Sequence, residues 1–213
     1  MGAGKYAVLI YPHFSLQEIT CLTSCLAVWY GESMDILGSE KKPYISEDGF
    51  SVTPTKTVEE AHPRDYACVI LPGTTDPLPA LFDDKLIAFL RKGRDSDTLF
   101  AAISSAPLLL AKAGLLESAD FTAGFFMQML DVFPFIPRER FVHRPVVESG
   151  NVITAIGMFY REFAEAVLHR LGYETGKHFL DAGWRNYTPE ELTFRWSDGD
   201  FAEFRQELAQ YER

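Results

Sequence analysis

Three short runs of apolar residues constrain the fold of this chain more than any other feature. They cover residues 5–11 (KYAVLIY), 66–71 (YACVIL) and 98–103 (TLFAAI). An unbroken apolar run of this length predicts a β-strand that is buried on both faces, because a half-buried strand alternates between apolar and polar residues. Helical patterns lie between the runs, so we expect a mostly parallel sheet that is covered by helices on both sides.

The remaining elements are predicted from hydrophobic periodicity and from turn residues. We expect helices at residues 15–30, 79–93, 108–113 and 158–171, a strand at 34–38, hairpins at 44–53 and 141–155, a short strand at 121–123, and helix or loop at 125–135. The polar tail after residue 172 is expected to hold two helices. The predicted fold class is therefore α/β, a flavodoxin-like three-layer sandwich over residues 1–172. Residues 173–213 are predicted to form a helical C-terminal extension of the same domain.

The net charge and the cysteine content indicate which partners the protein could bind and in which cellular compartment it works. A net charge of −10 over 213 residues leaves no basic stripe for nucleic acid. No apolar run approaches the ~20 residues that span a bilayer, and no secretory segment precedes the first strand. Three unclustered cysteines indicate a reducing compartment and are too few for a zinc site. We therefore expect a cytoplasmic protein that binds neither membrane nor nucleic acid, with no metal and no cofactor.

The strongest candidate for a functional residue is Ser104. The apolar run at 98–103 breaks at Ser104-Ser105-Ala106-Pro107, and helix formers follow at residues 108–113. A strand, a sharp turn of small residues and a helix together lift one side chain off the sheet and aim backbone N–H groups at what it attacks. The alternative is an ordinary junction between a strand and a helix, which is common.

Three segments are expected to meet at one edge of the sheet. Residues 11–18, 72–75 and 104–106 each follow a predicted buried strand. In parallel sheets, ligands bind beyond the carboxyl ends of the strands, so this edge is the predicted site. Glu18 lies in the first segment. Its spacing from Ser15 also fits a helix capping box, which would be a purely structural role.

The chain resembles the ThiJ/PfpI family, which includes relatives of the parkinsonism-associated deglycase and has the class I glutamine-amidotransferase-like fold. The resemblance extends over about residues 5–172. The matching residues are Glu18, Leu71-Pro72-Gly73, the elbow AAISSAP at 101–107, the run LLLAKAGLL at 108–116, and GNVITA at 150–155.

The resemblance implies roles for several residues. The family elbow normally carries a cysteine at the position of Ser104, and a glutamate that matches Glu18 lies beneath it. The implied oxyanion donors are the backbone N–H groups of Thr74 and Ser105, next to Gly73. The family usually has glycine where Thr74 stands, and many members carry histidine where Ser105 stands. The resemblance also implies a homodimer.

A serine at the elbow changes the chemistry that we expect. A cysteine thiolate needs little activation, whereas a serine hydroxyl needs an adjacent base. Glu18 could serve as that base if burial raises its pKa. His13, in the loop before Glu18, could complete a Ser–His–Glu set, or it is simply a solvated loop residue.

Three classes of function remain open. The first is a hydrolase or amidotransferase-like acyl-transfer enzyme that uses Ser104. The second is a relative that binds a small molecule at the same site without turnover. The third is a non-catalytic, stress-related or structural dimer. The aromatic segment at residues 125–141 is a candidate for an apolar surface that a second copy would cover.

Overall fold

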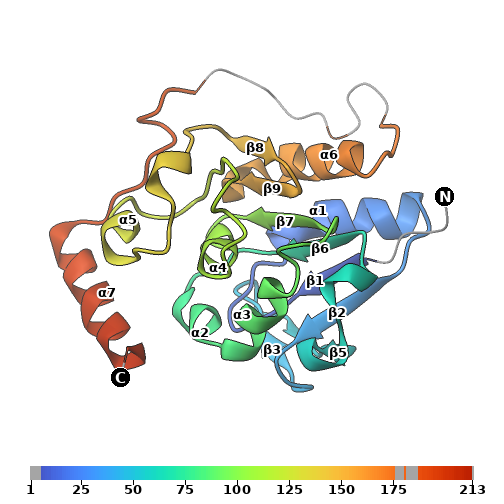
Figure 1. The fold of residues 1–213 in the computed structure, drawn as a ribbon, viewed down its shortest axis with the longest axis horizontal. Helices are drawn as coiled ribbons and strands as arrows, with labels where there is room; N and C mark the ends of the chain where they lie inside the picture. Colours follow the sequence, from blue (N-terminus) through green and yellow to red (C-terminus); the bar gives the residue numbers. More distant parts are fainter. Residues whose placement is uncertain (1–5, 176–179, 181–186, 213) are drawn as a thin grey trace.

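A seven-stranded sheet forms the centre of the molecule (Figure 1). The computed structural model describes residues 6–175, 180 and 187–212. The strands are β1 (Tyr6–Leu9), β2 (Met34–Gly38), β5 (Lys56–Thr57), β6 (Cys68–Leu71), β7 (Leu99–Ile103), β8 (Val146–Ser149) and β9 (Val152–Ala155). They lie in the order β5-β2-β1-β6-β7-β9-β8, and every pair is parallel except β8 with β9. The predicted mostly parallel sheet is confirmed.

Helices cover both faces of this sheet. The helices of the described residues are α1 (Gln17–Ser24), α2 (Leu78–Leu81), α3 (Asp84–Arg91), α4 (Pro107–Lys112), α5 (Met129–Val132), α6 (Tyr160–Arg170) and α7 (Asp198–Tyr211), with a π turn at Cys25–Trp29 and 3₁₀ turns at Val58–Glu60, Pro63–Asp65, Arg138–Arg140 and Gly157–Phe159. Helix α1 packs against α6 on one face, while α2, α3 and α4 pack together on the other (Figure 1). The three-layer α/β architecture is therefore also confirmed.

The apolar runs of the sequence become the core. Every residue of β1, β6, β7 and β9 is buried, as expected for strands with a helix layer on each side. A separate hairpin, β3 (Tyr44–Ile45) with β4 (Ser51–Val52), is antiparallel as predicted and lies outside the main sheet.

The expected capping box at the start of α1 is wrong. The helix begins at Gln17, and its N-cap residue Leu16 has no side-chain cap. Instead, Asp48 from the β3–β4 hairpin accepts the Leu16 N–H through Oδ2 at 2.7 Å. A carboxylate from a distant segment thus stabilises the helix terminus, and Glu18 is left to make other contacts.

Two helix predictions also need correction. The helix expected at 79–93 is divided into α2 and α3, because the Asp83 carboxylate accepts the N–H groups of Lys85 and Leu86 and starts a new helix there. Within the tail, residues 187–212 contain one helix, α7. Residues 176–179 and 181–186, where part of the expected extension falls, lie outside the described residues.

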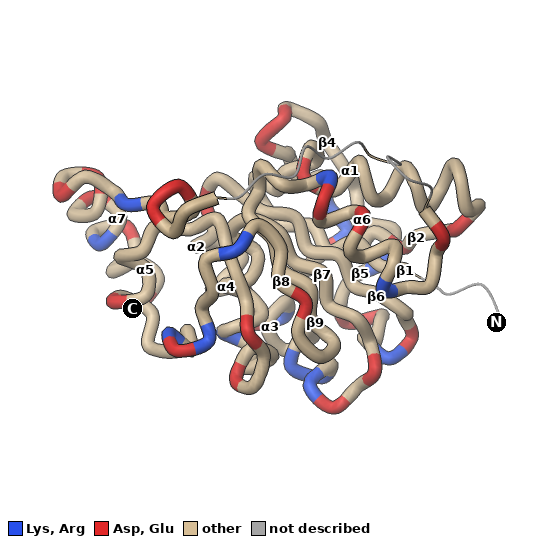
Figure 2. The backbone as a smooth tube through the Cα atoms, turned by 90° about the horizontal axis from the view of Figure 1, so that it is seen from above, with Lys and Arg blue, Asp and Glu red and all other residues tan. Residues whose placement is uncertain are grey.

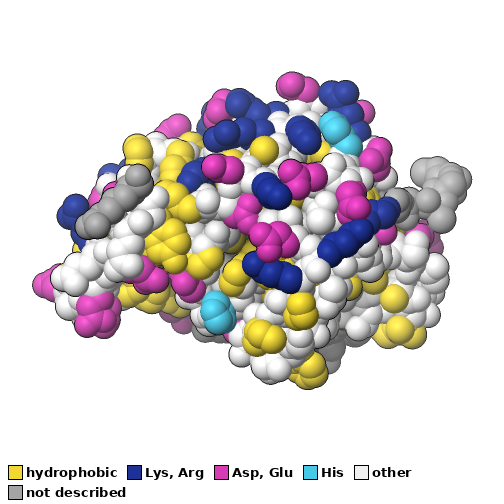
Figure 3. Space-filling model, turned by 90° about the horizontal axis from the view of Figure 1, so that it is seen from below, with side chains coloured by type: hydrophobic (Ala, Val, Ile, Leu, Met, Phe, Trp, Pro, Cys, Tyr) yellow, Lys and Arg dark blue, Asp and Glu magenta, His cyan; other side chains and the backbone are white. Residues whose placement is uncertain are grey.

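Charged side chains are distributed over the surface without a single basic patch on the views shown. In Figure 2, acidic and basic positions are interspersed along the chain, and the face in Figure 3 likewise carries Lys and Arg among Asp and Glu. Within the described ranges, no helix is both long enough and apolar enough to cross a membrane.

Candidate functional site

Ser104 lies in a sharp turn directly after β7. Its φ is +62°, and among the non-glycine residues that the structure describes, only His13 shares a positive φ. The Ser104 N–H donates to Ala155 O at 2.8 Å, and its carbonyl oxygen accepts the Gly124 N–H at 2.8 Å. Such a backbone conformation costs about 1–3 kcal/mol and persists only where neighbouring segments enforce it. The sharp turn predicted at Ser104 is therefore present, and its backbone is strained.

Glu18 reaches this turn from the first turn of α1. Its Oε2 accepts the Gly73 N–H at 2.7 Å, and the side chains of Glu18 and Ser104 both face Gly73, where an added Cβ would lie less than 3.0 Å from each. Burial raises the pKa of Glu18 from 4.5 to about 7, although its interactions with Ser104 and with the Gly73 N–H oppose this shift. The carboxyl is therefore close to half ionised at neutral pH.

Glycines make room for the contact between Glu18 and Ser104. A Cβ at Gly73 would lie less than 3.0 Å from Glu18 Oε2 and from Ser104 Oγ, and one at Gly157 less than 3.0 Å from Glu18 Oε1. Gly124 faces Ser104 from a third segment, where a Cβ would lie 3.3 Å from Ser104 Cα. Sequence reasoning missed the last two glycines. Gly157 could have been found from its position just after the strand at 151–155.

Tyr11 is a second residue that the sequence did not single out. Its side chain is fully buried, and its hydroxyl donates to Pro72 O. Burial and, to a lesser extent, the charge of Glu18 raise the pKa of this tyrosine well above its ordinary value. Tyr11 therefore acts as a neutral donor that fixes the Pro72-Gly73 turn under Glu18.

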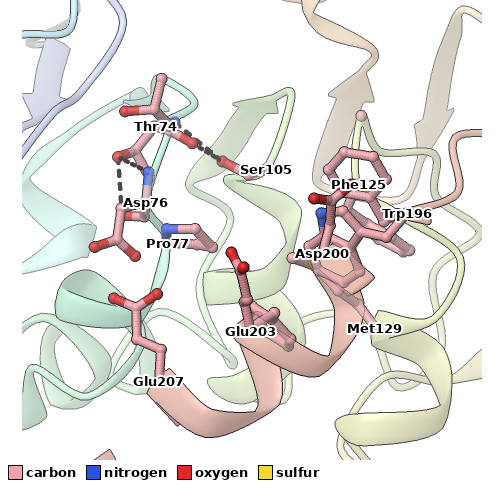
Figure 4. A pocket seen from close by; sticks show the side chains of 14 residues that line it. Thr74, Asp76, Pro77, Ser105, Phe125, Met129, Trp196, Asp200, Glu203 and Glu207 are labelled. Atoms are coloured by element: carbon pink, nitrogen blue, oxygen red, sulfur yellow. Dashed lines mark hydrogen bonds between the residues drawn. The ribbon is translucent and has the colours of Figure 1, made fainter. Parts of the chain in front are cut away.

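The two residues named as oxyanion donors contact each other. The Thr74 N–H donates to Ser105 Oγ at 3.0 Å, and Ser105 Oγ donates to Thr74 O at 3.0 Å (Figure 4). Thr74 is not among the residues with positive φ. A threonine can therefore occupy this position without the backbone freedom of glycine.

His13 does not join this group. Its side chain is exposed, and its backbone N–H donates to Ile45 O at 2.9 Å. In the part of the chain that the structure describes, no hydrogen bond connects the His13 ring with Ser104 or Glu18. The geometry fits the alternative of a solvated loop histidine.

A cavity of about 340 Å³ opens beside the elbow (Figure 4). Thr74, Ser105 and Gly124 line its end nearest Ser104. The rest of its wall comes from α7 and the residue Trp196 before it, from the segment around α5, and from the loop between β6 and α2, and it combines apolar side chains with carboxylates. These residues are Phe125, Phe126, Met129, Trp196 and Phe204, and the acidic Asp76, Asp200, Glu203 and Glu207.

The cavity wall has an acidic character. It contains four carboxylates and neither lysine nor arginine, and within the described residues none of the four forms an ion pair. Like charges repel an anion that enters, so the wall disfavours anionic ligands. Among the described side chains, no three His, Cys, Asp or Glu are grouped so that they could hold a metal ion.

All three cysteines are free, and none is an activated thiol. Burial raises the pKa of Cys21, of Cys25 and, most strongly, of Cys68. They behave as small apolar residues.

The aromatic segment at 125–141 is not the free surface that we expected for a dimer. Phe125 and Phe133 are buried at 3% exposure each. The C-terminal segment covers this region, since Trp196 stacks on Phe126 with ring centroids 4.2 Å apart and Phe204 packs edge-on against Phe133. The chain's own tail thus takes the place that a second copy would have taken.

Comparisons with known proteins agree with this architecture. The model of the DJ-1/PfpI family matches residues 5–170. The deglycase PfpI of Pyrococcus furiosus is 26% identical over 69% of this chain and 80% of its own length, and the isonitrile hydratase of Pseudomonas putida is 25% identical over 70% and 64%. The structure of a DJ-1 superfamily protein of Agrobacterium tumefaciens superposes with a TM-score of 0.72 at 20% identity, covering 98% of this chain and 99% of that one. For three of the curated relatives, including the isonitrile hydratase, the match to this chain covers only 22% to 64% of the relative's own length.

Proposed function

Because the chain belongs to the DJ-1/PfpI family, we propose that its elbow binds and hydrolyses a small molecule with a carbonyl group. Ser104, at the position where the family elbow normally has cysteine, is the nucleophile, and Glu18 is its base. The observation that carries this proposal is the Glu18 carboxyl, which faces Gly73 together with the Ser104 side chain and whose pKa burial raises to about 7. A carboxylate with this pKa accepts a proton from an alcohol more readily than one with an ordinary pKa.

The chemistry has two balanced steps. Ser104 Oγ bonds to the carbonyl carbon of an ester while its proton moves to Glu18, and the C=O electron pair moves onto oxygen. The tetrahedral intermediate collapses, the alcohol leaves with the proton from Glu18, and an acyl-serine remains. Water then attacks the acyl group by the same route, which releases the acid and restores Ser104.

The cavity supports a restriction on the ligand. With four carboxylates in its wall, it favours neutral or cationic molecules over anions. Apolar side chains such as Phe125 and Met129 offer contact area for an apolar group of the ligand. A location in the cytoplasm, where the three free cysteines stay reduced, also belongs to this proposal.

Labelling and turnover at Ser104 test the proposal. We expect a fluorophosphonate to modify Ser104 in the wild type, and we expect Ser104→Ala to abolish both the label and the hydrolysis of 4-nitrophenyl acetate. Ser46→Ala is the matched control, because Ser46 is a buried serine whose hydroxyl accepts a backbone N–H in the β3–β4 hairpin. If Ser104→Ala hydrolyses the ester as fast as the wild type, the catalytic proposal is wrong.

A non-catalytic dimer is the second candidate, and one surface feature favours it. An apolar groove of about 360 Å³ runs between α1 and β2, lined by Ile19, Ala27 and Met34 among others. Val28, in the π turn at Cys25–Trp29 that follows α1, is 75% exposed. Contiguous apolar surface of this kind suits a protein partner. Sedimentation should give a dimer mass at micromolar concentration for the wild type and a monomer mass for Val28→Asp; a monomeric wild type would remove this candidate.

A further inference from the structure

One hydroxyl group engages both backbone groups of Thr74. Ser105 Oγ accepts the Thr74 N–H and donates to the Thr74 carbonyl oxygen, each at 3.0 Å (Figure 4). Both residues are buried, at 8% and 9% exposure. An N–H that already donates to a well-placed acceptor has no second strong hydrogen bond to give. Another acceptor can therefore use the Thr74 N–H only after the Ser105 hydroxyl has left it.

The backbone on both sides of this contact is fixed. Thr74 Oγ1 lies 3.0 Å from Pro12 O and accepts the Asp76 N–H at 3.3 Å, so the Thr74 loop is held independently of Ser105. Ser105 is held as well, because its carbonyl oxygen accepts the Leu108 N–H at 3.1 Å. The movable part is the Ser105 hydroxyl, which can leave Thr74 by rotation about χ1.

We propose that Ser105 is a positioning residue that gates the Thr74 N–H. Its hydroxyl occupies this donor and gives way to a ligand that brings a stronger acceptor, namely the oxyanion that forms when a carbonyl group is attacked. Both residues line the cavity, so a ligand there reaches the contact directly. The inference rests on the proposed function for the place of the ligand's carbonyl group, but it does not require Ser104 to be an effective nucleophile.

The negative charge of the oxyanion explains why the Ser105 hydroxyl gives way to it and not to the neutral carbonyl oxygen of the bound ligand. Hydrogen bonds to an ionised acceptor are about twice as strong as those to a neutral one. A neutral carbonyl oxygen competes poorly with a hydroxyl that makes two hydrogen bonds, whereas an oxyanion competes well. An interaction that is gained mainly in the transition state raises the rate rather than the affinity. Loss of a single oxyanion donor slows related reactions by roughly 10²–10³-fold. Removing the Ser105 hydroxyl frees the Thr74 N–H, so it should raise the acylation rate by part of this factor.

Two reactions of one thiol distinguish an effect on the oxyanion donor from an effect on how easily a reagent reaches residue 104. In a Ser104→Cys background, the thiolate attacks 4-nitrophenyl acetate: the S–C bond forms, the carbonyl electron pair moves onto oxygen, and 4-nitrophenolate leaves as the carbonyl re-forms. The same thiolate displaces iodide from iodoacetamide without any oxyanion. The ratio of the acylation rate to the alkylation rate therefore reports the oxyanion donor.

We expect Ser105→Ala in this background to raise the acylation rate about tenfold or more, and to change the alkylation rate less than about twofold. Ser105→Gly, which also lacks the hydroxyl, should behave in the same way and serves as the second variant if the alanine variant folds poorly. Thr98→Val is the matched control, because it removes a buried hydroxyl that donates to Pro63 O just before β7, at the opposite end of that strand. It should leave both rates unchanged.

The results of these measurements decide between the gate and the alternatives. If Ser105→Ala leaves the acylation rate unchanged, or raises it only in parallel with the alkylation rate, then Ser105 does not restrain the Thr74 N–H and the proposed gate is wrong. A thiol that reacts with neither reagent would overturn the gate and the proposed function together. Acylation that rises selectively, while wild-type Ser104 stays unlabelled by a fluorophosphonate, would support the gate and refute catalysis by Ser104.

Discussion

The Gly73 N–H and Glu18 Oε2 are joined by a hydrogen bond of 2.7 Å. This bond links the loop after β6 to the first turn of α1, and Ser104 approaches the same carboxyl from the end of β7. Three separate parts of the sequence thus meet at one half-buried carboxyl group.

A side chain at position 73 should break this arrangement. In Gly73→Ala, the new Cβ would lie less than 3.0 Å from Glu18 Oε2 and from Ser104 Cβ, so both side chains must move. We expect a loss of about 1–3 kcal/mol in the free energy of unfolding, measured in urea, together with loss of any reactivity at Ser104. Gly199→Ala in α7 is the control, since its Cβ would meet nothing closer than 3.9 Å. Equal stability of the two variants would contradict the close packing.

The raised pKa of Glu18 should appear in the pH dependence of stability. In the folded protein its carboxyl stays protonated up to about pH 7, whereas the unfolded chain releases the proton near pH 4.5. The unfolded state then binds fewer protons between these values, so the Glu18 contribution makes the folded protein less stable as pH rises from 4.5 to 7. This shift corresponds to about 3 kcal/mol.

Comparison with Glu18→Gln isolates this contribution. The difference in unfolding free energy between the wild type and the variant should change by that amount from pH 4.5 to 7 and level off above it. The control is Glu139→Gln, the same exchange at an exposed position outside this site. A flat difference for Glu18→Gln would mean that its carboxyl titrates normally.

A thiol at the elbow should be far more reactive than the native cysteines. Burial raises the pKa of Cys68 and Cys25, so both should react slowly with Ellman's reagent in the folded protein. Ser104→Cys should add one fast-reacting thiol. At pH 8 an ionised Glu18 opposes the thiolate, so adding Glu18→Gln should increase the rate further. A slower rate in the double variant would show that Glu18 assists the thiol instead.

The packing of α7 on the core can be tested at Leu208. This residue is 4% exposed on a helix that is otherwise largely solvated, so Leu208→Ala should lower the free energy of unfolding by about 2–3 kcal/mol. Val28→Ala, at a position that is 75% exposed, should cost less than about 0.5 kcal/mol. Similar values for the two variants would contradict a packed α7.

Much of the fold could be predicted because burial leaves a local pattern. The runs at residues 66–71 and 98–103 are almost entirely apolar, and each contains a central strand, β6 or β7, in which every residue is buried. Because the carboxyl ends of parallel strands lie at the same edge of a sheet, the sequence also predicted that Glu18 and Ser104 lie close together. The sharp turn at Ser104 was predicted from the break between a strand and a helix, whereas its positive φ is seen only in the structure.

The sequence by itself therefore determined the sheet, its helix layers and the edge where polar groups gather, because periodicity and turn residues act within a few positions. Only the tertiary structure decided which groups meet there. Gly157 faces Glu18 because β9 pairs with β7, the Ser105 hydroxyl reaches Thr74 across two loops, and α7 supplies carboxylates to the cavity. These contacts join residues that are far apart in the chain. They depend on how the elements pack in three dimensions, and local sequence patterns do not contain that information.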